Sequence, residues 1–316
     1  MPLKVALTAL LYFACAHTEV PRQPPSDLVV VDLLRSHEEG EKIYVQGRLS
    51  DGSMGLFMID TGAGISAISQ DLADRLAIEG THTGRSLQGL GGEAPLIQGE
   101  LQSLDFGGLH LGPVDVAIGV PGIPTHAGWM PIDGILGNNV WGHLVVAIDY
   151  PANRITLARP DALQVPSTAQ SIDFDGRHLR VPVTVSTGGD DERVEKRLVL
   201  ELDTGARSLL LSGEAGADFS ALSSEGEEPI YGVGASEDMP GSAFYRHTRH
   251  IPIQSVEIGG MEVAVDLDAT WINYGQGTHL GPTDLNGLVG HAVLNEHQVW
   301  IDFVNQRLAL LPSPSI

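Results

Sequence analysis

Residues 56–63 read Leu-Phe-Met-Ile-Asp-Thr-Gly-Ala, and residues 198–206 read Leu-Val-Leu-Glu-Leu-Asp-Thr-Gly-Ala. Each stretch is an apolar run typical of a buried β-strand, and each ends in the same four residues. A serine stands nine residues beyond each aspartate of the motif, Asp60 and Asp203. The recurrence of one motif together with its surroundings indicates an internal repeat.

A longer pair of matching segments follows the two motifs. Residues 133–150 begin Asp-Gly-Ile-Leu-Gly and end Ala-Ile-Asp-Tyr, while residues 286–303 begin Asn-Gly-Leu-Val-Gly and end Trp-Ile-Asp-Phe. Neither segment needs a gap to match the other, and both continue into a basic and then apolar run. Shared features in the same order and at nearly the same spacing indicate a tandem duplication.

The duplication and the composition together predict an all-β protein with two lobes. Glycine is frequent, at 38 of 316 residues, and aromatic residues make up only 5%, which favours a turn-rich fold over a helical bundle. The expected division is a leader over 1–16, an N-terminal extension over 17–40, a first lobe over 41–158, a linker with two prolines over 159–170 and a second lobe over 171–312.

Local patterns predict a similar hairpin at the start of each lobe. In the first lobe, strands are expected over 42–49 and 55–60, joined by a turn at Asp51-Gly52. In the second lobe, they are expected over 178–185 and 197–202, joined by a turn at 188–191. One helix is expected over 70–76, with Ser69 as its N-cap.

The charge balance limits the partners of the protein. The chain has 18 basic and 40 acidic residues, so its formal net charge is 18 − 40 = −22. Such a surface repels phosphate backbones and anionic lipid headgroups, which makes nucleic acids and anionic membrane faces poor partners. Most of the acidic residues are expected to serve only as a solvated surface.

The first sixteen residues resemble an export signal. An apolar run over 5–14 follows Lys4 and is too short to span a bilayer. Ala14-Cys15-Ala16 fits a signal-peptidase site, which implies a soluble exported protein, but Ala14-Cys15 also fits the end of a bacterial lipoprotein signal, which implies a lipid anchor at Cys15. We weigh these two interpretations equally, and a less favoured third is an uncleaved N-terminal segment. The predicted location is periplasmic, outer-membrane-anchored or extracellular.

The two motif aspartates are the candidate catalytic residues. If the lobes pack about a pseudo-twofold axis, Asp60 and Asp203 face each other, and two carboxylates at that separation share one proton. One can then activate a water molecule while the other donates a proton to a carbonyl oxygen, with no metal, cofactor or covalent intermediate. Thr61 and Thr204 can hydrogen-bond across the axis.

The glycines that follow, Gly62 and Gly205, permit close backbone approach and offer N–H donors to the carboxylates.

In these motifs the chain resembles the pepsin/retropepsin-like aspartic protease superfamily, and most of all the bacterial retropepsin-like aspartyl proteases. The resemblance covers about residues 41–312 and implies two tandem β-barrel lobes with the active cleft between them, and hydrolysis of peptide or protein substrates. It also implies substrate-binding flaps at two glycine pairs, Gly89 with Gly91 and Gly232 with Gly234. Ordinary turns are the alternative interpretation of these glycines.

Three departures from the family pattern affect the expected chemistry. The first flap lacks the tyrosine of pepsin-like enzymes, and Tyr231 lies beside the second flap instead. Arg207 follows the second motif, where it either lowers the pKa of Asp203 or points into solvent; we favour solvent. Ala63 and Ala206 lack a hydroxyl that would stabilise a charged aspartate, so we expect activity that extends to roughly pH 5–7.

Other functions are less well supported by the sequence. A G-x-G-x-x-A stretch at 62–67 lacks the acidic residue that dinucleotide binding requires, and the pair His247 and His250 has no third metal ligand. A non-catalytic, two-lobed peptide-binding protein remains the main alternative. A dimer that pairs like lobes from two chains is a second alternative, although the two unequal lobes of one chain favour a monomer.

Overall fold

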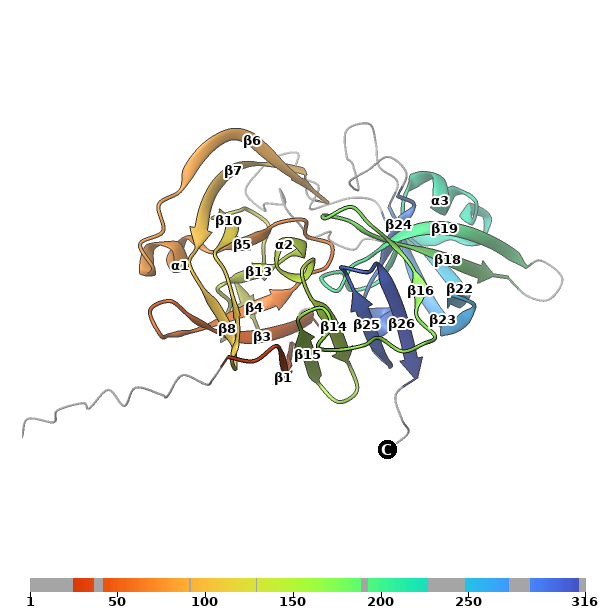
Figure 1. Ribbon diagram of the computed structural model, residues 1–316. Coiled ribbons are helices and arrows are strands. Elements are labelled where there is room, and N and C mark those ends of the chain that lie inside the picture. The colour runs from red at the N-terminus through yellow and green to blue at the C-terminus, as the bar shows by residue number, and fades with distance from the viewer. Residues whose placement is uncertain are drawn as a thin grey trace, which may run out of the picture.

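The computed structural model describes residues 25–36, 42–90, 92–128, 130–188, 193–226, 248–272 and 285–312. It contains two β-rich lobes, one on each side of Figure 1, and a six-stranded sheet that lies between and beneath them. This arrangement confirms the predicted all-β class with two tandem lobes. Among the described residues, no helix has both the length and the apolar composition needed to cross a bilayer.

The first lobe is built on a ten-stranded sheet. Its strands pair in the order β6, β7, β10, β5, β13, β4, β3, β8 and β9, and β2 pairs with β3. The bounds are β2 Leu34–Ser36, β3 Lys42–Leu49, β4 Met54–Ile59, β5 Ser66–Ile68, β6 Thr81–Gly89, β7 Gly92–Leu101, β8 Leu104–Phe106, β9 Leu109–Leu111, β10 Val114–Ile118 and β13 Gly134–Leu136. A small separate pair is formed by β11 His126–Ala127 and β12 Met130–Pro131.

The second lobe repeats this plan with eight strands. They pair in the order β17, β18, β19, β24, β20, β23, β22 and β21, and a further pairing of β18 with β22 brings the sheet back on itself. The bounds are β17 Asp173–Phe174, β18 Leu179–Thr187, β19 Val194–Leu202, β20 Leu209–Leu211, β21 Ser224–Gly226, β22 Thr248–Ile258, β23 Met261–Ile272 and β24 Gly287–Val289.

One strand in each lobe lies between the two strands that the Asp-Thr-Gly loop connects. In the first lobe, β13 runs parallel to β4 and antiparallel to β5, so the loop from β4 to β5 crosses over the end of β13. In the second lobe, β24 is related in the same way to β19 and β20. The repeated apolar-apolar-Gly segments therefore form the strands that support the two loops.

The six-stranded sheet joins the lobes. Its strands pair in the order β1, β15, β14, β25, β26 and β16, with bounds β1 Leu28–Asp32, β14 Val145–Asp149, β15 Arg154–Ala158, β16 Gln170–Ser171, β25 His297–Asp302 and β26 Arg307–Pro312. The two halves of the chain meet where β14 pairs antiparallel with β25, from Val145 opposite Asp302 to Asp149 opposite Gln298.

Strands from the predicted extension and linker pair with strands of the shared sheet and of the first lobe. The N-terminal extension, expected over 17–40, contributes β1 to the shared sheet and β2 to the first-lobe sheet. The last residue of the expected linker over 159–170 begins β16, which pairs with β26. The described strands of both segments, β1, β2 and β16, satisfy hydrogen-bonding groups at strand edges and so form part of the folded sheets.

The hairpin and helix predictions agree closely with the structure in the described parts. The strand expected over 42–49 is β3, and the return strand begins and ends one residue earlier than expected. Helix α1 Gln70–Arg75 has Ser69 as its N-cap, with the Ser69 hydroxyl accepting from Leu72 N–H. In the second lobe, β18 and β19 both extend beyond the predicted strands, and of the expected turn over 188–191 only Gly188 is described.

The expectation of a single helix is wrong. Three further short helices occur at α2 Asn138–Trp141, α3 Gly213–Ala217 and α4 His291–Leu294, with a 3₁₀ turn at Ser220–Leu222. They are too short to show a helical hydrophobic period, and their N-caps make no side-chain bond.

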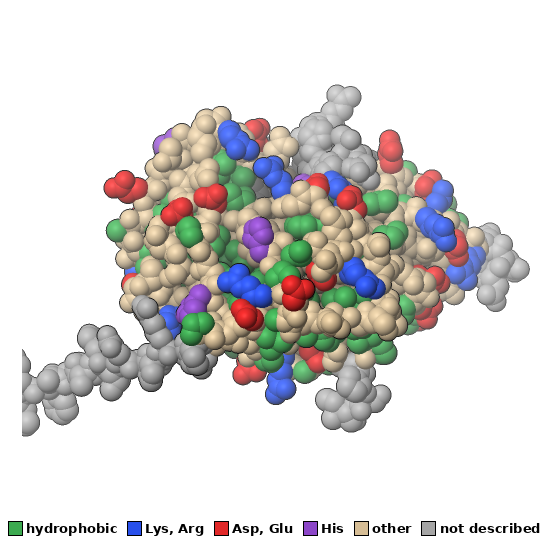
Figure 2. Space-filling model, in the orientation of Figure 1, with side chains coloured by type: hydrophobic (Ala, Val, Ile, Leu, Met, Phe, Trp, Pro, Cys, Tyr) green, Lys and Arg blue, Asp and Glu red, His purple; other side chains and the backbone are tan. Residues whose placement is uncertain are grey.

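A continuous apolar core stabilises both lobes together. One cluster of buried side chains extends from Phe57 in the first lobe through Val146 and Val299 in the shared sheet to Leu200 in the second. The lobes are therefore not independent units. Figure 2 shows acidic and basic groups interspersed over one face of the protein.

Candidate active site

The two motif aspartates stand at equivalent ends of two strands. Asp60 follows β4 and Asp203 follows β19, and their backbone N–H groups donate to equivalent carbonyl oxygens, Leu136 at 3.1 Å and Val289 at 2.9 Å. These carbonyls belong to the inserted strands β13 and β24. Each aspartate is thus held at the end of a rigid strand, on a loop that is tied to the strand beneath it.

Reciprocal hydrogen bonds between Thr61 and Thr204 join the two loops. The Thr61 hydroxyl donates to Leu202 O at 2.6 Å and accepts from Thr204 N–H at 3.0 Å. The Thr204 hydroxyl donates to Ile59 O at 2.8 Å and accepts from Thr61 N–H at 3.1 Å. Both threonines are 1% exposed, so water cannot reach these polar groups. The four bonds between the loops are therefore the hydrogen bonds that satisfy them.

The two carboxyl groups are brought face to face by the glycines of the motif. Asp60 Oδ1 accepts from Gly62 and Ala63 N–H at 2.9 and 3.0 Å, and Asp203 Oδ1 accepts from Gly205 and Ala206 N–H at 2.8 and 3.1 Å.

A side chain on either glycine would collide with the opposite aspartate. A Cβ on Gly62 would lie 2.4 Å from Asp203 Cγ, and one on Gly205 would lie 2.7 Å from Asp60 Cγ. Only glycine permits this approach of each loop to the opposite carboxyl group.

Burial raises the pKa of both carboxyl groups, because it removes water from their charged forms. For Asp203 the negative charges of Asp60 and Glu201 raise the pKa further, whereas for Asp60 the positive charge of Lys42 opposes the effect of burial. The surrounding charges thus act in opposite directions on the two carboxyl groups, raising the pKa of Asp203 and lowering that of Asp60 against the effect of burial. Two such groups in contact hold one proton between them over a wide pH range.

The support beneath the two loops is also nearly symmetric. Asn138 and His291 begin equivalent helices, α2 and α4, and their backbone N–H groups donate to Ala63 O at 2.7 Å and Ala206 O at 2.9 Å.

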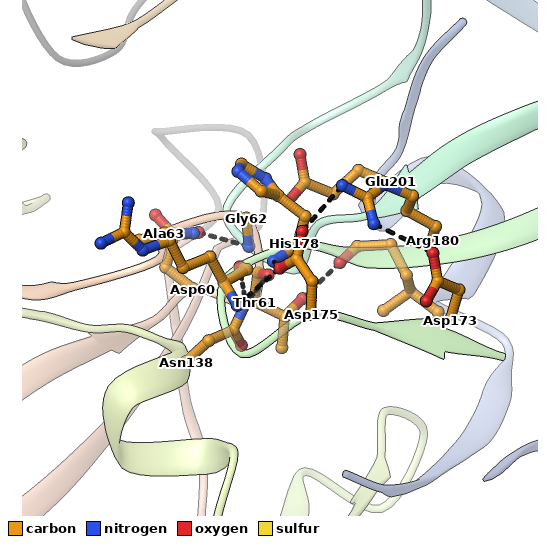
Figure 3. Close-up of polar contacts among 12 residues, drawn as sticks. Asp60, Thr61, Gly62, Ala63, Asn138, Asp173, Asp175, His178, Arg180 and Glu201 are labelled. Carbon is orange, nitrogen blue, oxygen red and sulfur yellow. Dashed lines mark hydrogen bonds and ion pairs between the residues drawn. The ribbon is translucent and has the colours of Figure 1, made fainter. Parts of the chain in front are cut away.

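The Asn138 side chain adds an unequal contact. Its amide donates to Thr61 O at 2.7 Å (Figure 3) and to Arg177 O at 2.6 Å, and so ties the first Asp-Thr-Gly loop to the second lobe.

Sequence reasoning missed a charged group beside the dyad. Glu201, two residues before Asp203, is 4% exposed, and its Oε1 lies 2.9 Å from Nδ1 of His178. The signal was present in the internal repeat: Glu201 stands where the first copy has Met58, and His178 stands where it has Lys42. Asn138 and Arg177 were missed as well, because their contacts join segments distant in sequence.

The predicted flap residues are only partly described. Gly89 ends β6 and pairs with Gly92 at the start of β7, so it lies at the tip of a long hairpin that arches over the first lobe (Figure 1). The next residue, Leu90, packs against an apolar cluster of the second lobe formed by Leu210, Ile272 and Leu288. Gly91, Gly232, Gly234 and Tyr231 lie outside the described residues.

Two other sequence expectations can be placed. Arg207 is exposed, as the solvent interpretation expected. Within the described segments, no group of three or more His, Cys, Asp or Glu side chains is arranged to hold a metal ion. His247 lies outside those segments, so the paired-histidine motif can be placed only at His250.

Comparisons with known proteins agree with this geometry. A family model described as aspartyl protease matches residues 45–140, which include Asp60 and the first supporting strand. The fold resembles the crystal structure of aspartic proteinase from Irpex lacteus, with a TM-score of 0.54 and 12% identity over 90% of this chain and 97% of that chain. A search of curated protein sequences gave no match.

The family match therefore covers most of the first lobe, and the likeness to the solved structure shows an aspartic-proteinase fold over most of the chain.

Removal of the Thr61 hydroxyl should destabilise the protein. Thr61→Val leaves Thr204 N–H and Leu202 O buried without their partner, which should lower the free energy of unfolding by about 2–4 kcal/mol. Thr61→Ser keeps the hydroxyl and should cost clearly less. Denaturant unfolding of both variants measures the difference, and equal losses would show that the hydrogen bonds do not stabilise the lobe junction.

Neutralising an aspartate should stabilise the protein at neutral pH. Because the folded pKa of Asp203 lies above its unfolded value of about 3.9, the stability that the protonated group contributes is present below that value and is lost as pH rises. Asp203→Asn should therefore unfold at higher denaturant at pH 7, with a gain on the order of 1 kcal/mol that disappears below about pH 4.

The control for this measurement is Asp115→Asn, which changes an exposed carboxylate on β10. A stability gain of the same size and pH dependence in that variant would contradict the assignment to the dyad.

Proposed function

We propose that the protein is an aspartic endopeptidase in which Asp60 and Asp203 activate a water molecule. The observation that carries the proposal is the pair of facing, pKa-raised carboxyl groups, each fixed by two backbone N–H groups and joined through Thr61 and Thr204. A structural core alone would gain nothing from two carboxyl groups placed in contact, since their burial is unfavourable.

The shared proton allows acid and base catalysis by the same pair. The ionised carboxylate takes a proton from water as the water oxygen forms a bond to the peptide carbonyl carbon, and the protonated partner donates its proton to the carbonyl oxygen. The resulting tetrahedral diol breaks its carbon–nitrogen bond as the carboxyl group that took the water proton gives it to the nitrogen, while the other carboxylate takes a proton from a hydroxyl of the diol. The products are a carboxylic acid and an amine, and the dyad returns with one proton.

Peptide cleavage should require both aspartates. The purified protein should cleave an unstructured protein or a peptide library, and Asp60→Asn and Asp203→Asn should each lower kcat/KM on the order of 10³-fold or more. Because the pKa of the dyad is raised, activity should extend to roughly pH 5–7. A pepstatin-type inhibitor should abolish the cleavage.

The same cleavage assay distinguishes an endopeptidase from a non-catalytic peptide-binding protein. Asp115→Asn removes an exposed carboxylate and should leave cleavage unchanged. A wild-type protein that binds peptides but is inert from acid to mildly alkaline pH would support a non-catalytic peptide-binding protein instead. Activity confined below about pH 4 would contradict the effect expected from Ala63 and Ala206.

We also propose that the protein is exported and acts as a monomer. Support for export comes from the apolar run over 5–14 and the cleavage signals at Ala14 and Cys15, which lie outside the described residues. Support for a monomer comes from the contacts between Thr61 and Thr204 of one chain.

Mass spectrometry of the mature protein from a bacterial host should show loss of the leader, with a lipid mass on Cys15 if the lipoprotein interpretation holds. An intact Met1 in the exported fraction would contradict the proposed removal of the leader. A dimer in solution at assay concentration would contradict the proposed monomer.

A further inference from the structure

The surroundings of the dyad break the symmetry of the two lobes at one pair of positions. In the second lobe, Glu201 on β19 pairs with Arg180 on β18, and His178 comes two residues before Arg180. In the first lobe, the equivalent pair is Met58 with Tyr44, and Lys42 comes two residues before Tyr44. The first lobe thus has an apolar residue near its aspartate, where the second lobe has a buried carboxyl group.

His178 holds the Glu201 side chain. The pair is joined at 2.9 Å, and the side chain of Glu201 is 5% exposed while that of His178 is 23% exposed. The backbone N–H groups of Arg177 and His178 donate to Asp175 Oδ1 at 2.9 and 2.8 Å, which fixes the turn from which His178 projects. Glu201 is therefore held in one position by its bond to His178 rather than free to turn into solvent (Figure 3).

Other charged groups near Glu201 are accounted for. On β18, Arg180 lies opposite Glu201 and binds Asp173 and Asp175 at 2.9 and 2.8 Å, and its positive charge lowers the pKa of Glu201 and so favours the ionised form. On the other side of Glu201, β24 contributes Leu288, which has no charge. The remaining titratable groups that face Glu201 among the described residues are His178, Asp60 of the first lobe and Asp203 itself.

We propose that Glu201, held by His178, is a positioning residue that keeps the shared proton of the dyad on Asp203 and leaves Asp60 as the carboxylate that activates water. This inference rests on the proposed function. Residues two apart on a strand lie on the same face, about 7 Å apart, close enough for one charge to affect the other strongly in a site with little water.

The opposite charges in the two lobes act in the same direction. Lys42 favours a negative charge on Asp60, whereas Glu201 disfavours one on Asp203. Glu201 also repels a charge on Asp60, but it precedes Asp203 by only two residues of the same chain segment, which places its main effect on Asp203. The positive charge of His178 only partly cancels that of Glu201, because the imidazole is the more exposed partner and solvent screens it more. As pH rises and His178 loses its proton, the negative charge of Glu201 acts on Asp203 without this compensation.

We expect this effect to extend the pH range of peptide cleavage towards higher pH. The active dyad carries one proton, and the alkaline limb of the pH profile marks its loss. A negative charge beside Asp203 delays that loss. Glu201→Gln should therefore move the alkaline limb of kcat/KM down by roughly one pH unit.

Glu201→Met installs the residue of the equivalent first-lobe position and should move the limb in the same direction. Glu195→Gln is the matched control, because it removes a negative charge from the same strand at a side chain that is 56% exposed, and it should leave the profile in place.

Carboxyl carbon NMR on protein labelled at aspartate tests the proton position without any substrate. In the wild type, Asp203 should titrate at higher pH than Asp60, with the two signals assigned through Asp60→Asn and Asp203→Asn. In Glu201→Gln the Asp203 midpoint should fall. The imidazole midpoint of His178, raised by its bond to Glu201, should also fall, towards about 6.5.

The outcomes separate this inference from the proposed function. If wild type cleaves peptides but Glu201→Gln and Glu201→Met lower only the melting temperature, with the alkaline limb and the Asp203 midpoint unchanged, Glu201 is merely structural and the inference is wrong. If wild type cleaves nothing, the proposed function fails, and the Asp203 titration alone decides whether Glu201 controls the proton.

Discussion

The reciprocal hydrogen bonds between Thr61 and Thr204 are the contact on which the arrangement of the site depends. Each threonine binds a carbonyl and an N–H of the opposite loop, so neither loop is complete without the other lobe. The shared sheet and the continuous core bring the lobes together, but they tolerate small adjustments. The buried hydrogen bonds do not, because a displacement of either loop would leave polar groups without partners. They therefore determine the separation of the two aspartates.

That separation places an unfavourable pair of charges inside the protein. Two partly buried carboxyl groups in contact resist losing both protons, and the raised pKa of each group expresses this resistance. Backbone donors from Gly62 and Gly205 offset part of the cost. The rest is balanced by the apolar core that both lobes share. The instability of the dianion is also what gives the pair one acidic and one basic member, so the same physical cost supports the proposed chemistry.

Symmetry and its exceptions have different roles in this molecule. The backbone bonds from Asp60, Asp203, Asn138 and His291 follow the pseudo-twofold axis closely, since both loops must present a carboxyl group in the same geometry. The charged side chains around the loops are not related by this pseudo-twofold axis. Lys42 near one aspartate and Glu201 near the other make the two carboxyl groups chemically unequal. A duplicated fold can in this way provide matched geometry while side chains differentiate the two roles.

Much of the fold was predictable because it depends on local patterns. The apolar run that ends at Asp60, the hairpin turn at Asp51-Gly52 and the Ser69 cap are all determined by neighbouring residues, and each occurs within a residue of its predicted place. The short helices α2 and α4 were not predictable, since four residues carry no helical period. The six-stranded sheet was not predictable either, because it pairs strands about 150 residues apart, such as Val145 with Asp302.

The sequence by itself determined that the chain is a duplication and that Asp60 and Asp203 are its equivalent aspartates, because repeated motifs can be compared without knowing where they lie in space. Only the tertiary structure decided what surrounds them. The charges of Glu201, His178 and Lys42 act over distances set by strand register and lobe packing, and the contact from Asn138 to Arg177 crosses between lobes. Electrostatic interaction depends on separation in space and on burial, and neither quantity can be read from positions along the chain.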